Sequence, residues 1–368
     1  MAYPLIEQLI NQYMFTDKWY KRQWHYTEAC ILKAYLDRYE LTGDSRYYSF
    51  VKQFVDGLFD DSGNIPQLDW GYYNIDQIKM GSILLELYRL EADSRYLGIA
   101  ARLHQQLQTY PRTPSGSFWH KSNYPNQIWL DGLYMAQPFS AQYTKEFLSG
   151  KDYADCVLQL TNVRKFLFNE QDCLYYHAYD ESREIFWCDP ATGRSPCVWG
   201  RAVGWYAMAL IDVIHIVEDD PAVREPLEAI LRETIDGMIP YQHPSGMWHQ
   251  VVNVTDRPDN YLESSGTLML AYSILKAVRL GVLPESYAHY GQSALAGTVD
   301  QYLGTVEDEV QLGGICQSAG VGRNPETGVV RDGTYEYYIH RENIVSNNGH
   351  GVAPLIMAYN ELQRGQGR

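Results

Sequence analysis

The chain has 368 residues, 45% of them hydrophobic, which is enough to bury a substantial core and argues against intrinsic disorder. Its 30 Lys and Arg stand against 45 Asp and Glu, for a net charge of -15. Nucleic-acid grooves and anionic membranes both need clustered basic residues, so this balance argues against both classes of partner.

The N-terminal stretch MAYPLIEQLINQYMF has no basic start, no long apolar run and no small-residue cleavage site, so it does not resemble a signal peptide. No window has the roughly 18 uninterrupted apolar residues of a membrane span. The 6 cysteines form no CxxC pair, and a chain of this length does not depend on disulfides. We therefore expect a cytoplasmic protein with reduced thiols.

The first half of the chain carries a repeated helical unit. Apolar residues in segment 23–41 follow the i, i+3, i+4 spacing of a helix. Gly43 is placed to end that helix, and Asp44 or Ser45 to cap the next one. The tetrapeptide Asp-Ser-Arg-Tyr occurs at 44–47 and again at 93–96, which indicates repeated helical hairpins.

Glycine followed by an almost continuously apolar helix recurs along the chain, and such helices are expected to be buried. These segments begin at Gly81, Gly132, Gly204, Gly266 and Gly351. Segments near residues 45, 93, 151, 221 and 286 carry more charge on one face and should lie outside. The pattern predicts an all-α fold, an (α/α)6 toroid of about twelve helices in which inner and outer helices alternate.

Long segments rich in Gly, Pro, Asn, His and aromatic residues separate the predicted hairpins, at 110–127, 170–198, 240–262 and 305–347. We expect them at one rim of the barrel, with some of them paired as short strands. Loops on a rigid scaffold often carry function. No stretch rich in Pro, Ser or charge divides the chain, so we predict a single domain over 1–368.

Two aspartates stand where buried helices are predicted to begin, Asp76 in YNIDQIKMG and Asp131 in IWLDGLYMA. An aspartate at a helix start is more often a cap for backbone N–H groups. Here both have aromatic neighbours that a simple cap does not need, namely Tyr72, Tyr73, Trp129 and Tyr134. In a toroid both would face one central cavity, where two carboxylates can divide acid and base roles across a sugar.

The chain also has 31 Tyr and 9 Trp, and flat rings with a polar edge suit sugars. CVWGRAVGWYAMAL places Trp199, Arg201 and Trp205 around a helix start, where arginine can bind a carboxylate through two parallel hydrogen bonds. The alternative is core tryptophans with a structural Arg–Asp pair. His177 in LYYHAYDES is a candidate donor or base, although a loop histidine beside two tyrosines is more often structural.

Motifs of several other chemistries are missing from the sequence. There is no HExxH or CxxC pattern for zinc, and His243 and His249 lack a third ligand at metal spacing. There is no P-loop, no dinucleotide fingerprint and no GxSxG nucleophile elbow. We therefore expect neither a metal nor a cofactor.

Together, YNIDQIKMG, IWLDGLYMA, LYYHAYDES and WGRAVGWYAMAL resemble the unsaturated rhamnogalacturonyl hydrolases of glycoside hydrolase family 105. The unsaturated glucuronyl hydrolases of family 88 are a more distant match. The resemblance runs from about Trp24 to Tyr359 and implies an (α/α)6 barrel. It also implies a substrate class, short oligosaccharides from polysaccharide lyases with a 4,5-unsaturated uronic acid at the non-reducing end. The implied reaction is hydration of the vinyl ether.

By matching motifs, the resemblance gives Asp131 the acid and base role and makes Asp76 the second carboxylate. The implied substrate contacts are Tyr26, Trp129, His177, Trp199, Arg201 and Trp205. Val203 departs from the family, because many relatives have Asn there, and this leaves the substrate subtype open. The leaving sugar is rhamnose from pectin rhamnogalacturonan by family default, and a glucuronyl-rhamnose substrate is the alternative.

Other functions also fit a toroid with these residues. An inverting glycosidase would use Asp76 and Asp131 on saturated oligosaccharides, with a water between them. A sugar epimerase would need paired histidines, and His177 has no evident twin. A carbohydrate-binding protein would use the same acids and rings for recognition alone. The sequence does not indicate an oligomeric state.

Overall fold

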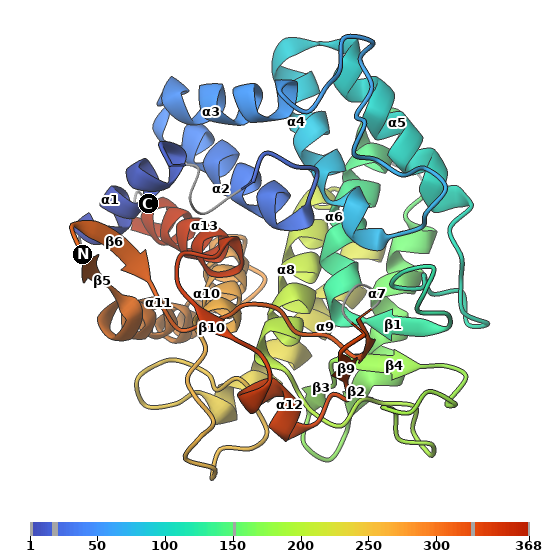
Figure 1. Cartoon of the computed structure of the whole chain (residues 1–368), viewed down its shortest axis with the longest axis vertical. Helices are drawn as coiled ribbons and strands as arrows, with labels where there is room; N and C mark the ends of the chain where they lie inside the picture. Colours follow the sequence, from blue (N-terminus) through green and yellow to red (C-terminus); the bar gives the residue numbers. More distant parts are fainter. Residues whose placement is uncertain (1–2, 17–20, 150–151, 325–327, 367–368) are drawn as a thin grey trace.

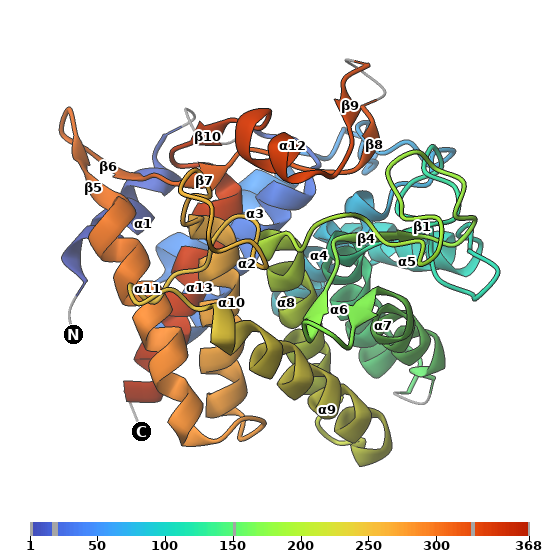
Figure 2. The same ribbon diagram turned by 90° about the horizontal axis from the view of Figure 1, so that it is seen from below.

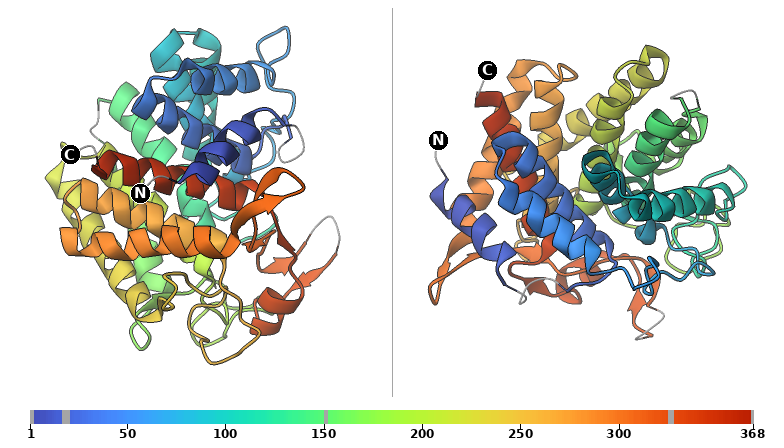
Figure 3. Two further views of the ribbon diagram at one scale, coloured as in Figure 1. Left: turned by 90° about the vertical axis from the view of Figure 1, so that its left-hand side faces the viewer. Right: turned by 90° about the horizontal axis from the view of Figure 1, so that it is seen from above.

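The computed structural model describes residues 3–16, 21–149, 152–324 and 328–366. Within these ranges, six helices form an inner ring, in chain order α2 (Tyr26–Thr42), α4 (Met80–Glu91), α6 (Leu130–Phe147), α8 (Gly200–Ile216), α10 (Ser264–Arg279) and α13 (Gly349–Gln366). Each packs against the next, and α13 closes the ring against α2. Figure 3 shows this closure, with the last helix beside the first ones.

Six further helices of the described residues lie outside this ring: α1 (Pro4–Met14), α3 (Ser45–Asp56), α5 (Ser94–Gln108), α7 (Ala154–Leu167), α9 (Pro221–Met238) and α11 (Ala288–Tyr302). From α3 to α11, each outer helix packs on the inner helix that precedes it, while α1 packs on α13 (Figure 1). The prediction of an all-α (α/α)6 barrel is confirmed.

Burial follows the predicted division into inner and outer helices. Every residue of α8 from Gly200 to Ile214 is buried, whereas α3 buries only four of its residues, Tyr47, Val51, Phe54 and Val55. A helix that is apolar all round needs neighbours on every side, and the ring of helices supplies them. In the described part of the chain, no helix has both the length and the apolar character that crossing a bilayer requires.

The repeated tetrapeptide caps two outer helices in the same way. Gly43 ends α2 with a φ of 70°, and the Asp44 side chain accepts from the Arg46 N–H at the start of α3. Asp93 accepts from the Arg95 N–H at the start of α5. The predicted repeat is thus confirmed as two hairpins with matching caps.

The long connecting segments form short antiparallel pairs, as expected. The strands are β1 (Gln127–Trp129), β2 (Phe168–Asn169), β3 (Leu174–Tyr175), β4 (Ala178–Asp180), β5 (Leu303–Val306), β6 (Glu309–Leu312), β7 (Ile315–Cys316), β8 (Gly322–Arg323), β9 (Val330–Arg331) and β10 (Ile344–Val345). The pairs are β1 with β4, β2 with β3, β5 with β6, β7 with β10, and β8 with β9. Figure 2 shows β1, β4 and β7 to β10 at one end of the barrel.

Short helical turns lie in the connections: η1 (Ile75–Ile78), η2 (Ile239–Tyr241), η3 (Glu285–Tyr287) and α12 (Tyr335–His340), of which η3 joins α10 to α11 at the opposite end of the barrel. The sequence predicted only loop or strand within 305–347, and α12 was missed. Its six residues are too few to show a helical period, and it is held by Thr334, whose side chain accepts from the Tyr337 N–H.

Gly266 sets the spacing between α8 and α10, which leads to a stability prediction. A Cβ on Gly266 would lie 2.7 Å from the Arg201 backbone nitrogen and 2.8 Å from the Gly200 carbonyl carbon, and backbone atoms cannot turn aside. We expect Gly266→Ala to lower the free energy of unfolding by about 1–3 kcal/mol in a urea titration.

Gly98 in α5 is the matched control, because a Cβ there would meet nothing within 4 Å. Gly98→Ala should leave stability unchanged or raise it by up to about 1 kcal/mol, since alanine favours a helix. A Gly266→Ala variant as stable as the wild type would show that α8 and α10 can move apart without a loss of stability.

Candidate active site

The starts of the inner helices bring the predicted site residues to the end of the barrel that carries the strands. Tyr26 opens α2, Asp76 lies in η1 just before α4, and Asp131 is in the first turn of α6. Arg201 and Trp205 are in the first turns of α8, and Trp199 caps that helix. Pairing of β1 with β4 sets Trp129 opposite Ala178, next to His177.

Asp131 and His177 meet at the centre of this group. His177 Nε2 lies 3.1 Å from Asp131 Oδ2, and the Leu130 N–H donates to the His177 carbonyl. The His177 side chain is fully buried, while that of Asp131 is 15% exposed. The imidazole therefore sits behind the carboxylate, and the carboxylate keeps an open side.

Tyr338 fixes the other nitrogen of the same imidazole. Its hydroxyl lies 2.6 Å from His177 Nδ1. Burial raises the pKa of Tyr338 well above its ordinary value, so the hydroxyl keeps its proton. When Tyr338 donates to Nδ1, the N–H of a neutral His177 is on Nε2, which lies close to Asp131 Oδ2 but forms no hydrogen bond among the described residues.

Asp76 is an ion-pair partner rather than a cap. Asn74 caps η1 by accepting from the Asp76 N–H, which leaves the Asp76 carboxylate for other contacts. Its Oδ2 lies 2.8 Å from Lys121 Nζ and its Oδ1 lies 4.0 Å from His120 Nε2. Burial acts to raise the pKa of Asp76, but Lys121 and His120 outweigh it and bring the pKa below its ordinary value. Asp76 is thus an anion at neutral pH.

His120 belongs to a stack of rings beside these carboxylates. Burial lowers its pKa to about 4, so the imidazole is neutral at physiological pH. Its ring stacks on Trp129 with centroids 4.2 Å apart, and Tyr124 stacks on the same indole at 5.0 Å. Trp129 also meets His177 edge-on at 5.5 Å. One aromatic cluster therefore links the surroundings of Asp76 to those of Asp131.

Arg201 and Trp199 lie deeper in the barrel. Arg201 is 2% exposed, and its Nη1 donates to the Cys316 carbonyl and to Ser265 Oγ. Its guanidinium lies 4.6 Å from the Trp199 ring, whose indole N–H donates to Gln250. Within the described ranges these contacts include no aspartate, and Arg201 Nε has no hydrogen-bond partner. The alternative of a structural Arg–Asp pair is therefore not what Arg201 forms.

Tyr26 and Trp205 form another wall of the site. The Tyr26 hydroxyl lies 2.7 Å from His350 Nε2, and its ring meets Trp205 edge-on at 6.4 Å. Burial raises the pKa of Tyr26, Asp76 and Asp131 add to that effect, and Arg201 opposes it. The hydroxyl is thus within electrostatic reach of all three predicted charged groups.

The structure adds four polar residues that the sequence reasoning did not single out: His120, Lys121, Tyr338 and His350. His120 and Lys121 lie in the predicted 110–127 loop, and an adjacent His and Lys there was the available signal. No sequence pattern marked Tyr338. Val203 is 1% exposed and belongs to the hydrophobic core, so this position offers no polar contact.

The chemistry available here is that of two carboxylates in different surroundings. One is held as an anion by a lysine and the other stands beside a buried imidazole, while the two side chains are almost equally exposed, at 14% and 15%. Such a pair can divide the tasks of proton transfer and charge stabilisation. Among the described residues, no group of three or more His, Cys, Asp or Glu side chains is arranged to hold a metal ion.

Comparison with known proteins gives consistent similarities. The sequence pattern described as Glycosyl Hydrolase Family 88 matches residues 6–366. Protein Atu3128 of Agrobacterium fabrum is 44% identical over 193 residues, 51% of this chain and 81% of that protein. The unsaturated rhamnogalacturonyl hydrolase YesR of Bacillus subtilis is 26% identical over 309 residues, 82% of each chain. The solved structure of a C. acetobutylicum glycoside hydrolase from family 105 is 36% identical with a TM-score of 0.89, covering 98% of this chain and 99% of that one.

Removing the lysine that holds Asp76 gives a pH-dependent stability prediction. The pKa of Asp76 is depressed in the folded state, so the pair stabilises the fold above the unfolded pKa of about 4 and loses this effect as the pH falls through the folded pKa. We expect Lys121→Met to lower the free energy of unfolding by about 1–3 kcal/mol at pH 7. In urea titrations, the difference in free energy of unfolding between Lys121→Met and the wild type should become smaller as the pH falls towards about 2.

Lys52→Met is the control, because Lys52 pairs with Asp56 at 2.6 Å on an outer helix with both side chains 31% exposed. Lys52→Met should lower the free energy of unfolding by less than about 0.5 kcal/mol at pH 7. A loss in Lys121→Met that is the same at both ends of the pH range would mean that Lys121 contributes packing rather than charge.

Proposed function

Because this chain belongs to glycosyl hydrolase family 88 and the related family 105, we propose that it releases a 4,5-unsaturated uronic acid from the non-reducing end of oligosaccharides left by polysaccharide lyases. The proposed reaction is hydration of the vinyl ether rather than displacement at the anomeric carbon. The observation that carries the proposal is the pair of carboxylates described above, with Asp131 against His177 Nε2 and Asp76 against Lys121.

In the proposed reaction Asp131 delivers a proton to C4, and the electrons of the C4–C5 double bond form the new C4–H bond. Positive charge develops at C5 and is shared with the ring oxygen. Water adds at C5, and the proton that it loses returns to Asp131. The hemiketal formed at C5 opens, and the sugar attached at C1 leaves. One water is consumed, and the carboxyl group is restored.

The neighbouring residues have supporting roles in this proposal. The Asp76 anion stabilises the positive charge that develops near C5, and Lys121 keeps it ionised. His177, whose Nε2 lies 3.1 Å from Asp131 Oδ2, packs against that carboxylate and orients it towards the substrate. The free Nε of Arg201 is the donor we assign to the uronate carboxylate. Tyr26, Trp129, Trp199 and Trp205 supply the ring surfaces around the sugar.

We further propose unsaturated galacturonyl-rhamnose as the substrate, and this finer assignment is supported by the similarity to YesR. A cytoplasmic location and a single domain over 1–368 remain predictions from the sequence. The inverting glycosidase stays the alternative, because it would use the same two aspartates.

The decisive assay follows loss of the enol-ether ultraviolet absorbance when the protein is given several lyase-generated disaccharides. We expect Asp131→Asn to lower turnover by about 10²–10⁴-fold with a smaller change in KM, because it removes the proton donor and not the binding surface. Asp219→Asn, at a side chain that is 86% exposed, is the control and should turn over like the wild type.

Each contrary result has a meaning of its own. Wild-type turnover in Asp131→Asn would show that Asp131 is not the general acid. Equally fast cleavage of a saturated aryl glycoside would favour the inverting glycosidase. Binding of the unsaturated disaccharide without any loss of absorbance would identify a carbohydrate-binding protein.

A further inference from the structure

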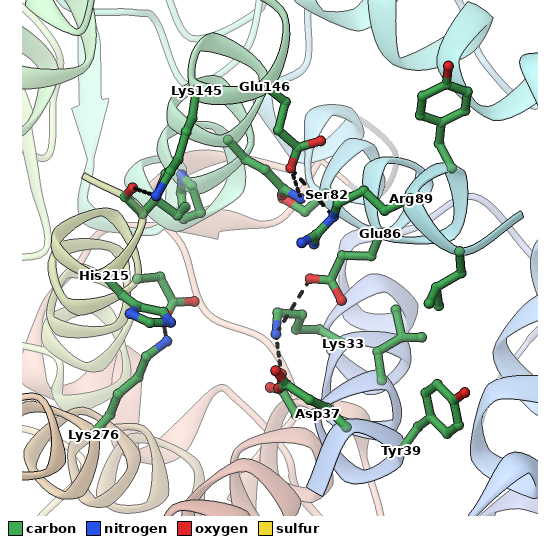
Figure 4. A pocket seen from close by; sticks show the side chains of 18 of the residues that line it. Lys33, Asp37, Tyr39, Ser82, Glu86, Arg89, Lys145, Glu146, His215 and Lys276 are labelled. Atoms are coloured by element: carbon green, nitrogen blue, oxygen red, sulfur yellow. Dashed lines mark hydrogen bonds and ion pairs between the residues drawn. The ribbon is translucent and has the colours of Figure 1, made fainter. Parts of the chain in front are cut away.

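A second cavity, of about 820 Å³, opens at the other end of the barrel. Most of its lining comes from the later turns of the inner helices, whereas the candidate active site is built at their first turns. None of the predicted site residues lines this cavity. Its volume suits a ligand of sugar size. Figure 4 shows the side chains that surround it.

Most charged groups of this cavity have partners within the wall. Lys33 lies between Asp37 and Glu86 (Figure 4), and Lys276 Nζ is 2.7 Å from Asp212 Oδ1. Basic residues also stand in the last turns of the inner helices, at Arg89, Lys145, Lys276 and Arg364. There they offset the negative ends of the helix dipoles, which is a structural role.

Lys79 does not fit this structural role. It is 2% exposed and stands at the N-terminal end of α4, where the helix dipole disfavours a cation. Its Nζ lies 3.3 Å from the centroid of the Tyr134 ring, a cation–π contact, and no carboxylate of the described residues lies within ion-pair distance of it. A buried ammonium without an anion is costly.

Burial and charge act on Lys79 in opposite directions. Burial, with a smaller contribution from Lys33, lowers the pKa of Lys79 to about 8, while Cys30, Asp212 and Glu86 act to raise it. An anion placed against the side chain would favour the ammonium form.

Ser82 contributes an unsatisfied hydroxyl to the lining of the same cavity. It is 4% exposed, and among the described residues its Oγ has no hydrogen-bond partner. Lys79 and Ser82 stand three residues apart at the start of α4, so their side chains lie on one face of that helix. Both residues line the cavity.

We propose that this cavity binds a small hydroxylated monocarboxylate, a sugar acid, whose carboxylate is held by Lys79 Nζ and Ser82 Oγ. One ammonium matches one negative charge. Asp37, Glu86 and Asp212 also line the cavity and disfavour a dianion such as a phosphate ester. Gln142 and the paired charged side chains supply donors and acceptors for hydroxyl groups. The site does not depend on the proposed reaction at Asp131.

The test is an isothermal titration of D-gluconate into the whole protein, with D-glucose as the neutral comparison. We expect one gluconate site and no glucose binding. Lys79→Met should weaken gluconate binding about tenfold or more, since a charge-assisted hydrogen bond is lost. Ser82→Ala should weaken it about fivefold, and its fold should be unaffected because the hydroxyl has no partner to lose.

Lys145→Met is the matched control, because Lys145 lines the same cavity but donates to the Ile216 carbonyl at 2.8 Å. Its gluconate affinity should stay within about twofold of the wild type. Gluconate affinity that is unchanged in both Lys79→Met and Ser82→Ala would overturn the proposal, as would the absence of binding. A gluconate-soaked crystal with the ligand only between Asp131 and Asp76 would also overturn it.

Discussion

The ion pair between Asp76 and Lys121 fixes the electrostatics of the loop-bearing end of the barrel. Asp76 is buried deeply enough to favour the neutral acid, and the lysine ammonium reverses that preference. In the part of the chain that the structure describes, Asp131 has no lysine partner of this kind but lies against His177. The difference between the two carboxylates therefore comes from which loop residue reaches each of them, while the helices supply only their positions. An assignment of acid and base roles depends on this asymmetry.

The direction of the inner helices explains why the two ends of the barrel differ. Their first turns meet at one end, where free N–H groups favour negative side chains, and both candidate carboxylates lie there. Their last turns meet at the other end, where basic residues such as Lys145 and Arg364 are suited to the free carbonyls. Lys79 is a cation at a helix start, and this position distinguishes it from the other lysines of the cavity.

Local patterns in the sequence were enough to predict the barrel and part of the site. Apolar runs that follow glycines predicted five of the inner helices, and capping residues such as Asp44 predicted where outer helices begin, because both signals depend on neighbours in the chain. Lys121 and Tyr338 could not be found in this way. Their contacts with Asp76 and His177 are made by loops, and these join residues far apart in the sequence. A side chain that joins the site only through such a long-range contact leaves no periodic pattern in the sequence.

Closure of the ring by α13 against α2 has a consequence for biosynthesis. The last inner helix lies at the C-terminal end of the chain, and its partner lies near the start. During translation, α2 cannot bury the face that α13 covers until α13 itself has been synthesised. Contacts of such long sequence separation form late and slow the final step of folding. The growing chain therefore exposes an apolar helix face on the ribosome until α13 has been synthesised. Chaperones that bind exposed apolar surfaces can act during this interval.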